Sequence, residues 1–180
     1  MPTLESLKQS LGEETKDLRL NLGGVLGSGS LDDRQRYAVA LASALFLESQ
    51  DLAEAILADG GDRLDADTVA DAKASAAIMA MNTVYYRFRH MVGKESYQHR
   101  QAGLRMTRMA RPATSKALFE LCSMACAALA GCETCIQSHE QSLLKEGLTE
   151  DQVHDAVRIA AVVQGFQVAL SCARVVPQPG

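Results

Sequence analysis

The 180-residue chain has no tryptophan, and aromatic residues make up only 4% of it. β-Sheets usually need more aromatic and β-branched side chains than that, whereas the abundant alanine and leucine are strong helix formers. No segment shows the alternation of apolar and polar residues that is typical of a half-buried strand. These absences argue against a sheet-based architecture and predict an all-α fold.

An excess of positive charge, a long uncharged run and a leader segment are missing as well. The net charge is −4, and no aromatic residues interleave with the arginines that lie close together at positions 100, 105, 108 and 111. We therefore expect no nucleic-acid partner. No uncharged run reaches the roughly 18 residues of a membrane span, so we expect no membrane partner. The N-terminus lacks the basic and apolar blocks of a signal peptide, and we expect a cytoplasmic location.

Glycine and proline punctuate a chain that otherwise carries a helical pattern of apolar residues. Two short amphipathic segments within residues 3–22 precede a glycine-rich run, 23–30, which we expect to be a flexible connection. The main helices are expected at about 31–48, 49–58, 65–90, 114–130, 132–146 and 149–174. A chain of this length can bury a substantial core, and we expect a single domain that spans 1–180.

An internal repeat organises these helices. Residues 37–90 and 117–174 both consist of a helix, a break, a second helix, an acidic cap and a long alanine-rich helix. In this comparison, Val69–Ala72 of the first copy falls opposite Val153–Ala156 of the second. The C-x-x-C sequence occurs in the second copy only. We therefore predict an internally duplicated helical scaffold with its active site in the C-terminal copy.

One short stretch carries the residues with the most specific chemistry. Cys132 and Cys135 form a C-x-x-C pair at the expected start of a helix, directly after Gly131. His139 follows one helical turn after Cys135, and residues three and four apart share a helix face. The thiols can therefore form a disulfide, and the imidazole can take a proton from Cys135. In a reducing compartment this pattern indicates redox catalysis or metal binding rather than packing.

Glu120 is an isolated acid in the otherwise apolar run 117–124, where an unpaired carboxylate would be costly to bury. If two helices fold back at Gly131, a rise of about 1.5 Å per residue puts Glu120 and His139 roughly 16 and 12 Å from the corner. The difference of about 4 Å is within the reach of side chains. We therefore expect Glu120 to pair with His139 and to orient it.

The other cysteines and one polar stretch receive a structural interpretation. Cys122 and Cys126 fall opposite alanines in the first copy, so we expect small packing residues there, and we expect Cys172 in the core. A zinc site that joins Cys122 and Cys126 to the C-x-x-C pair is an alternative, but both lie well inside the preceding helix. We interpret the polar and aromatic stretch 79–87 as core and interface rather than as a substrate site.

The spacing of Glu120, the C-x-x-C pair and the following histidine resembles that of the alkylhydroperoxidase AhpD family, which belongs to the carboxymuconolactone decarboxylase-like superfamily. Four further stretches resemble that family: 18–22, 80–87, 103–106 and 156–165. The resemblance therefore extends over nearly the whole chain. One departure is visible, because Thr134 stands where some members of the family have a histidine inside the C-x-x-C motif.

The resemblance implies a homotrimer of all-helical, duplicated subunits with peroxidase activity towards organic hydroperoxides. It also implies that the protein reduces a partner peroxiredoxin, with electrons from the lipoyl groups of a dihydrolipoamide acyltransferase. Dihydrolipoamide would be the electron donor, with no tightly bound cofactor and no metal. The family's catalytic residues carry over onto four positions: Glu120, Cys132, Cys135 and His139.

We expect Glu120 and His139 to deprotonate Cys135, which attacks the peroxide and becomes a sulfenic acid. Cys132 would then form a disulfide with it, and the reducing dithiol would arrive at Cys132. In the alternative order, Cys132 attacks the peroxide and Cys135 closes the disulfide, because the helix N-terminus favours a thiolate at Cys132. Two alternative functions are a zinc-binding or redox-sensing module without turnover and a decarboxylase-like enzyme on the same scaffold, which would not need a C-x-x-C.

Overall fold

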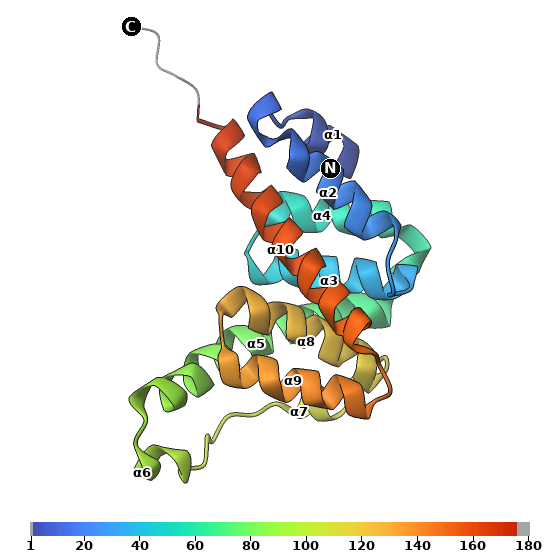
Figure 1. The fold of residues 1–180 in the computed structure, drawn as a ribbon. Helices are drawn as coiled ribbons and strands as arrows, with labels where there is room; N and C mark the ends of the chain where they lie inside the picture. The colour runs from blue at the N-terminus through green and yellow to red at the C-terminus, as the bar shows by residue number, and fades with distance from the viewer. Residues whose placement is uncertain (1, 176–180) are drawn as a thin grey trace, which may run out of the picture.

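A computed structural model describes residues 2–175, and within this range the chain folds into helices and connecting segments without strands (Figure 1). The prediction of an all-α fold is confirmed. The longer helices are α2 (Lys16–Gly27), α3 (Asp33–Phe46), α4 (Gln50–Gly60), α5 (Ala66–Val92), α8 (Lys116–Ala130), α9 (Glu133–Lys145) and α10 (Glu150–Ala173). The short ones are α1 (Leu4–Gln9), α6 (Glu95–Gln98), α7 (Thr107–Ala110) and the 3-10 turns η1 (Glu13–Thr15) and η2 (Gly61–Arg63).

Side-chain caps explain where four of the long helices begin. The side chains of Asp32, Asp65, Ser115 and Thr149 each accept a hydrogen bond from a backbone N–H of the first turn of α3, α5, α8 and α10. Such caps satisfy donors that have no partner within the helix. At the other end of α8, Gly131 adopts a left-handed conformation with φ of 62° and stops the helix. These boundaries agree with those expected from the sequence.

The prediction of a flexible connection over 23–30 is wrong for its first half. Helix α2 continues through its glycines to Gly27, and the extended backbone begins only at Ser28. The cause is tertiary packing, because Leu22, Val25 and Leu26 are all buried in the hydrophobic core. Burial of three large side chains on one helix face outweighs the roughly 1 kcal/mol per residue by which glycine disfavours a helix.

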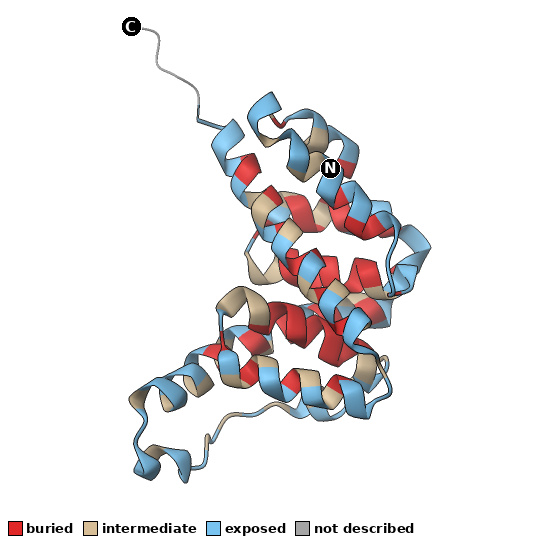
Figure 2. Ribbon diagram, in the orientation of Figure 1, coloured by how far each residue is buried: buried red, intermediate tan, exposed pale blue. Residues whose placement is uncertain are grey.

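The core lies where α3 and α8 pack against each other and against the two longest helices, α5 and α10 (Figure 2). Phe119 of α8 and Phe166 of α10 are fully buried there. Helix α10 is long and apolar enough, by length and composition alone, to cross a membrane. Some of its apolar residues, such as Ile159 and Val163, are buried against the neighbouring helices, whereas Val168 is exposed.

The helices of both predicted repeat copies are present. Helices α3, α4 and α5 cover the first copy, and α8, α9 and α10 cover the second, in the order that the sequence comparison expects. Helix order alone does not demonstrate a duplication, so the internal repeat stays a prediction.

A buried carboxylate anchors the segment 93–115, which leaves the body of the protein after α5 and returns along it (Figure 1). Asp71 of α5 accepts hydrogen bonds from Arg108 Nε at 2.7 Å, from the backbone N–H of Ala113 at 3.1 Å, and from the backbone N–H and hydroxyl of Thr114 at 2.7 and 2.6 Å. Burial acts to raise the pKa of Asp71, but these hydrogen bonds outweigh it and hold the pKa below its ordinary value. The ionised Asp71 thus fixes this segment against α5.

Replacement of Asp71 with Asn is expected to lower the free energy of unfolding by about 2–3 kcal/mol at pH 7, because the ion pair and the charge-assisted hydrogen bonds are lost. Because the pKa of Asp71 is lower in the folded protein, its ionised carboxylate stabilises the fold at pH values above the unfolded pKa of about 3.9. This stabilisation is lost as the pH falls through the folded pKa. Urea unfolding at pH 7 and pH 3 should therefore show a much smaller difference between wild type and variant at pH 3.

The matched control is Asp67→Asn, which removes an exposed acid from the first turn of the same helix. It is expected to cost less than about 1 kcal/mol. An equal cost of Asp71→Asn at both pH values would contradict a role for the ionised carboxylate.

Candidate functional site: a dithiol beside a cavity

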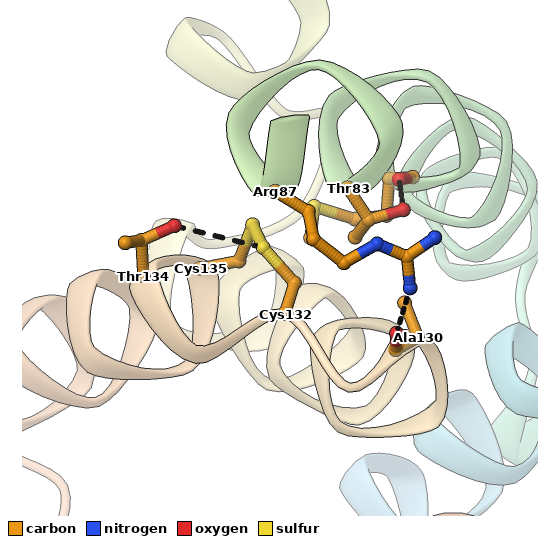
Figure 3. The surroundings of a disulfide bond; sticks show 7 residues. Thr83, Arg87, Ala130, Cys132, Thr134 and Cys135 are labelled. Carbon is orange, nitrogen blue, oxygen red and sulfur yellow. Dashed lines mark hydrogen bonds between the residues drawn. A yellow bond between two sulfur atoms is a disulfide. The ribbon is translucent and has the colours of Figure 1, made fainter. Parts of the chain in front are cut away.

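The C-x-x-C pair lies at the point where the chain turns from α8 into α9 (Figure 3). After the left-handed Gly131, Cys132 takes the N-cap position of α9 and Cys135 lies in its first turn. The two sulfurs are joined in a disulfide, with the Cα atoms 5.2 Å apart. Cys132 is completely buried, and Cys135 is 6% exposed. The local sequence therefore builds a redox-capable dithiol into a helix N-terminus, as expected.

The surroundings of the disulfide favour a negatively charged sulfur. The backbone N–H groups at the start of α9 give that end a partial positive charge, which stabilises a thiolate. Arg87 of α5 donates from Nη1 to the carbonyl of Ala130 at 2.6 Å, which places a guanidinium near the same turn (Figure 3). The hydroxyl of Thr134 lies 3.7 Å from Cys132 Sγ and can also interact with it.

Glu120 and His139 form the contact that the fold-back at Gly131 predicts. His139 Nδ1 lies 2.6 Å from Glu120 Oε2, and both side chains are buried between the neighbouring helices α8 and α9. When Glu120 is ionised, its carboxylate only accepts hydrogen bonds, and Nδ1 is then the nitrogen that carries the proton. In the neutral imidazole this leaves Nε2 as a free acceptor. The pair is therefore arranged to take up a proton at Nε2.

A cavity of about 360 Å³ opens beside Cys135 and His139. Its lining consists of Met79, Asn82, Tyr86, Met106, Met109, Thr134, Cys135, Ser138 and His139. The structure thus brings Cys135 and His139 to one cavity, and it connects Glu120 to that cavity through His139. Of the two disulfide cysteines, Cys135 is among the described residues that line the cavity, and Cys132 is not.

Two features of this cavity differ from the sequence interpretation. The stretch 79–87 is not only core and interface, because Met79, Asn82 and Tyr86 line the cavity next to the dithiol. Met106 and Met109, from the segment 93–115, were not anticipated as site residues at all. The only signal for them was the resemblance of residues 103–106 to a family stretch, which carries no information about where that segment packs.

The expected arrival of a reducing dithiol at Cys132 conflicts with the burial of this residue. In the disulfide form Cys132 is 0% exposed, whereas Cys135 lines the cavity. A molecule that enters the cavity therefore meets Cys135. Cys132 lies buried at the helix N-terminus.

The three cysteines outside the disulfide differ in environment. Cys122 and Cys126 are buried packing residues, as predicted. Burial raises the pKa of Cys122 to about 12 and that of Cys126 well above its ordinary value, so both stay protonated at neutral pH. The prediction for Cys172 is wrong: it is exposed, because the last turn of α10 extends past the core. Within residues 2–175, no group of three or more His, Cys, Asp and Glu side chains is arranged to hold a metal ion.

Comparison with known proteins agrees with this site. Residues 95–177, the part of the chain that contains the dithiol, match the carboxymuconolactone decarboxylase family. A protein of Anaeromyxobacter sp. (strain K), named alkyl hydroperoxide reductase AhpD, is 50% identical over 173 residues, or 96% of this chain and 93% of the relative. Proteins of the same name from Rhodospirillum centenum and Streptomyces griseus are 41% and 38% identical, over 93% and 97% of this chain and 90% and 99% of theirs.

The second half of this all-helical chain is thus similar to the carboxymuconolactone decarboxylase family. Since the similarity to the named relatives extends from end to end, the chain belongs to the alkyl hydroperoxide reductase AhpD family. The resemblance seen in the sequence is thereby confirmed.

Thiol titration should separate the five cysteines by environment. In the folded, oxidised protein we expect one rapidly reacting thiol, Cys172, because Cys122 and Cys126 are buried and protonated. Denaturation without a reductant should raise the count to three. The measurement is reaction with Ellman's reagent, and Cys172→Ser is the control that should remove the fast signal. Rapid reaction of Cys122 or Cys126 in the folded protein would contradict their placement.

Proposed function

We propose that the protein is a thiol-dependent peroxidase that reduces organic hydroperoxides through a dithiol–disulfide cycle of Cys132 and Cys135. The observation that carries this proposal is the shared cavity of Cys135 and His139, with His139 hydrogen-bonded to the buried Glu120. Three elements of thiol catalysis are therefore adjacent: a nucleophile, a base and a group that orients the base. The name of the relatives, alkyl hydroperoxide reductase, supports the same chemistry.

In the oxidative half of the cycle, His139 Nε2 takes the proton of the Cys135 thiol. The thiolate attacks the terminal oxygen of the hydroperoxide ROOH, the O–O bond breaks, and the alkoxide leaves as the alcohol ROH with the proton returned by His139. Cys135 is then a sulfenic acid. The Cys132 thiolate attacks its sulfur, and hydroxide leaves as water after taking up a proton, which closes the disulfide.

In the reductive half, a thiolate of dihydrolipoamide enters the cavity and attacks Cys135 Sγ. Cys132 leaves as a thiolate at the N-terminus of α9, where the helix dipole stabilises it. The second thiol of dihydrolipoamide then attacks the mixed disulfide, releases Cys135 and becomes the lipoamide disulfide. Two electrons and two protons thus pass to the enzyme, and the greater exposure of Cys135 supports this order of attack.

The same dithiol is proposed to pass electrons to a partner peroxiredoxin, whose disulfide it would reduce by exchange. The lipoyl groups of a dihydrolipoamide acyltransferase are the proposed source of the electrons, and the proposed assembly is a homotrimer. The membership in the AhpD family supports these three proposals.

Dihydrolipoamide-dependent reduction of cumene hydroperoxide tests the cycle. Cys135→Ser is expected to abolish turnover, and Cys132→Ser to stop the cycle after a sulfenic acid has formed at Cys135, where dimedone should trap it. Cys172→Ser is the control and should keep wild-type turnover. No peroxide reduction by the wild type would remove the proposed function. Dimedone capture at Cys132 in Cys135→Ser would reverse the roles of the two thiols.

Replacement of Glu120 with Gln tests the base. A glutamine amide can donate to His139 Nδ1, and this would move the imidazole proton to Nε2, the nitrogen that has to accept a proton. We expect kcat/KM for cumene hydroperoxide to fall by about 10²–10⁴ at pH 7. Glu54→Gln on α4 is the control for the same substitution outside the site. An unchanged kcat/KM would show that Glu120 only contributes to packing.

A further inference from the structure

One polar group on the cavity wall has no role in the mechanism above. Asn82 of α5 is 5% exposed and lines the cavity, and its buried Oδ1 has no hydrogen-bond partner among the residues that the structure describes. Buried amide groups are nearly always paired, so an amide with an unpaired oxygen needs an explanation. Natural proteins break such local rules mainly at functional sites.

Asn82 lines the same cavity as Cys135 and His139 but comes from a different helix. Met79, Asn82 and Tyr86 occupy positions i, i+3 and i+7 of α5 and therefore share one helix face, which forms one wall of the cavity. Cys135 and His139 come from α9, which packs against α5. A small molecule in the cavity thus contacts both α5, which carries the amide, and α9, which carries the reacting groups.

The rest of the lining indicates the class of substrate. Met79, Met106, Met109 and Tyr86 are the large apolar side chains in the lining of a cavity of about 360 Å³. Methionine is flexible and polarisable and accepts apolar groups of different shapes. This lining suits an alkyl or aryl group, while Asn82 is the amide available for the polar end of the same molecule.

We propose that Asn82 binds the hydroperoxide group itself, an inference that rests on the proposed peroxidase function. A hydroperoxide R–O–OH carries one donor, on its terminal oxygen, and acceptor lone pairs on both oxygens. The carboxamide of Asn82 supplies a donor for this set, because Nδ2 can donate to the inner oxygen. That inner oxygen becomes the alkoxide when the O–O bond breaks, so the amide stabilises the charge that develops there until His139 protonates it.

The test compares Asn82→Leu with Asn21→Leu, a substitution of the chain's other asparagine, which is exposed on α2. Pre-reduced proteins are mixed with cumene hydroperoxide, and the rate of disulfide formation is measured by stopped flow. We expect Asn82→Leu to be slower by about 10–100-fold and Asn21→Leu to match the wild type. Hydrogen peroxide should lose rate by the same factor, because the amide binds the O–OH group and not the apolar substituent.

Three further readouts exclude a merely structural role. Reduction of the disulfide by dithiothreitol should change by less than about twofold in Asn82→Leu, because no peroxide takes part in that step. The pH profile of Cys135 alkylation by iodoacetamide should be unchanged, which shows that the thiolate forms normally. Since leucine removes the unpaired acceptor, Tm is expected to rise by about 2–4 °C. Asn82→Ala serves as a second variant if the leucine distorts the cavity.

The outcomes separate this proposal from the proposed function. If the wild type reacts with hydroperoxide and both Asn82 variants react equally fast, the role of Asn82 is overturned while the peroxidase function stands. A loss of rate accompanied by a lower Tm and an altered alkylation profile also overturns it, because the residue would then act through the fold. If the wild type itself forms no peroxide-dependent disulfide, the peroxidase function fails first and the role of Asn82 fails with it.

Discussion

A buried hydrogen bond between Glu120 and His139 connects the architecture of this protein with its chemistry. A carboxylate inside the core is tolerated only where a partner compensates for the lost hydration, and His139 is that partner. The contact requires α8 and α9 to lie side by side, and the left-handed Gly131 makes this possible by reversing the chain. The same reversal places Cys132 and Cys135 at a helix N-terminus. One turn of the backbone therefore sets the positions of His139, Glu120 and both cysteines.

The cavity depends on a second set of interactions that lie outside this helix pair. Helix α5 supplies one wall, and the segment 93–115 supplies Met106 and Met109. That segment has little helix of its own, and the buried Asp71 holds it in place through Arg108 and Thr114. A charged anchor in the core thus positions an apolar part of the site. Asn82, on the wall of the same cavity, keeps a buried Oδ1 without a hydrogen-bond partner among the described residues.

The expectations that failed share a physical cause. The starts of four helices were predictable because a cap involves residues within one turn of each other. These caps are Asp32, Asp65, Ser115 and Thr149. The glycine-rich end of α2 and the exposure of Cys172 were not, because both depend on which surfaces other helices cover. Local propensity is a weak guide wherever packing supplies several kcal/mol.

The sequence by itself determined the all-α class, the family, the dithiol at a helix start and the pairing of Glu120 with His139. All of these follow from spacings along one helix or across one tight turn, where the helical rise converts residue number into distance. Only the tertiary structure decided that Cys135 rather than Cys132 faces a cavity, and that Met79, Asn82 and Met106 line it. These residues are far apart in the chain, and nothing except the packing of α5 and of the segment 93–115 against α9 brings them to one place.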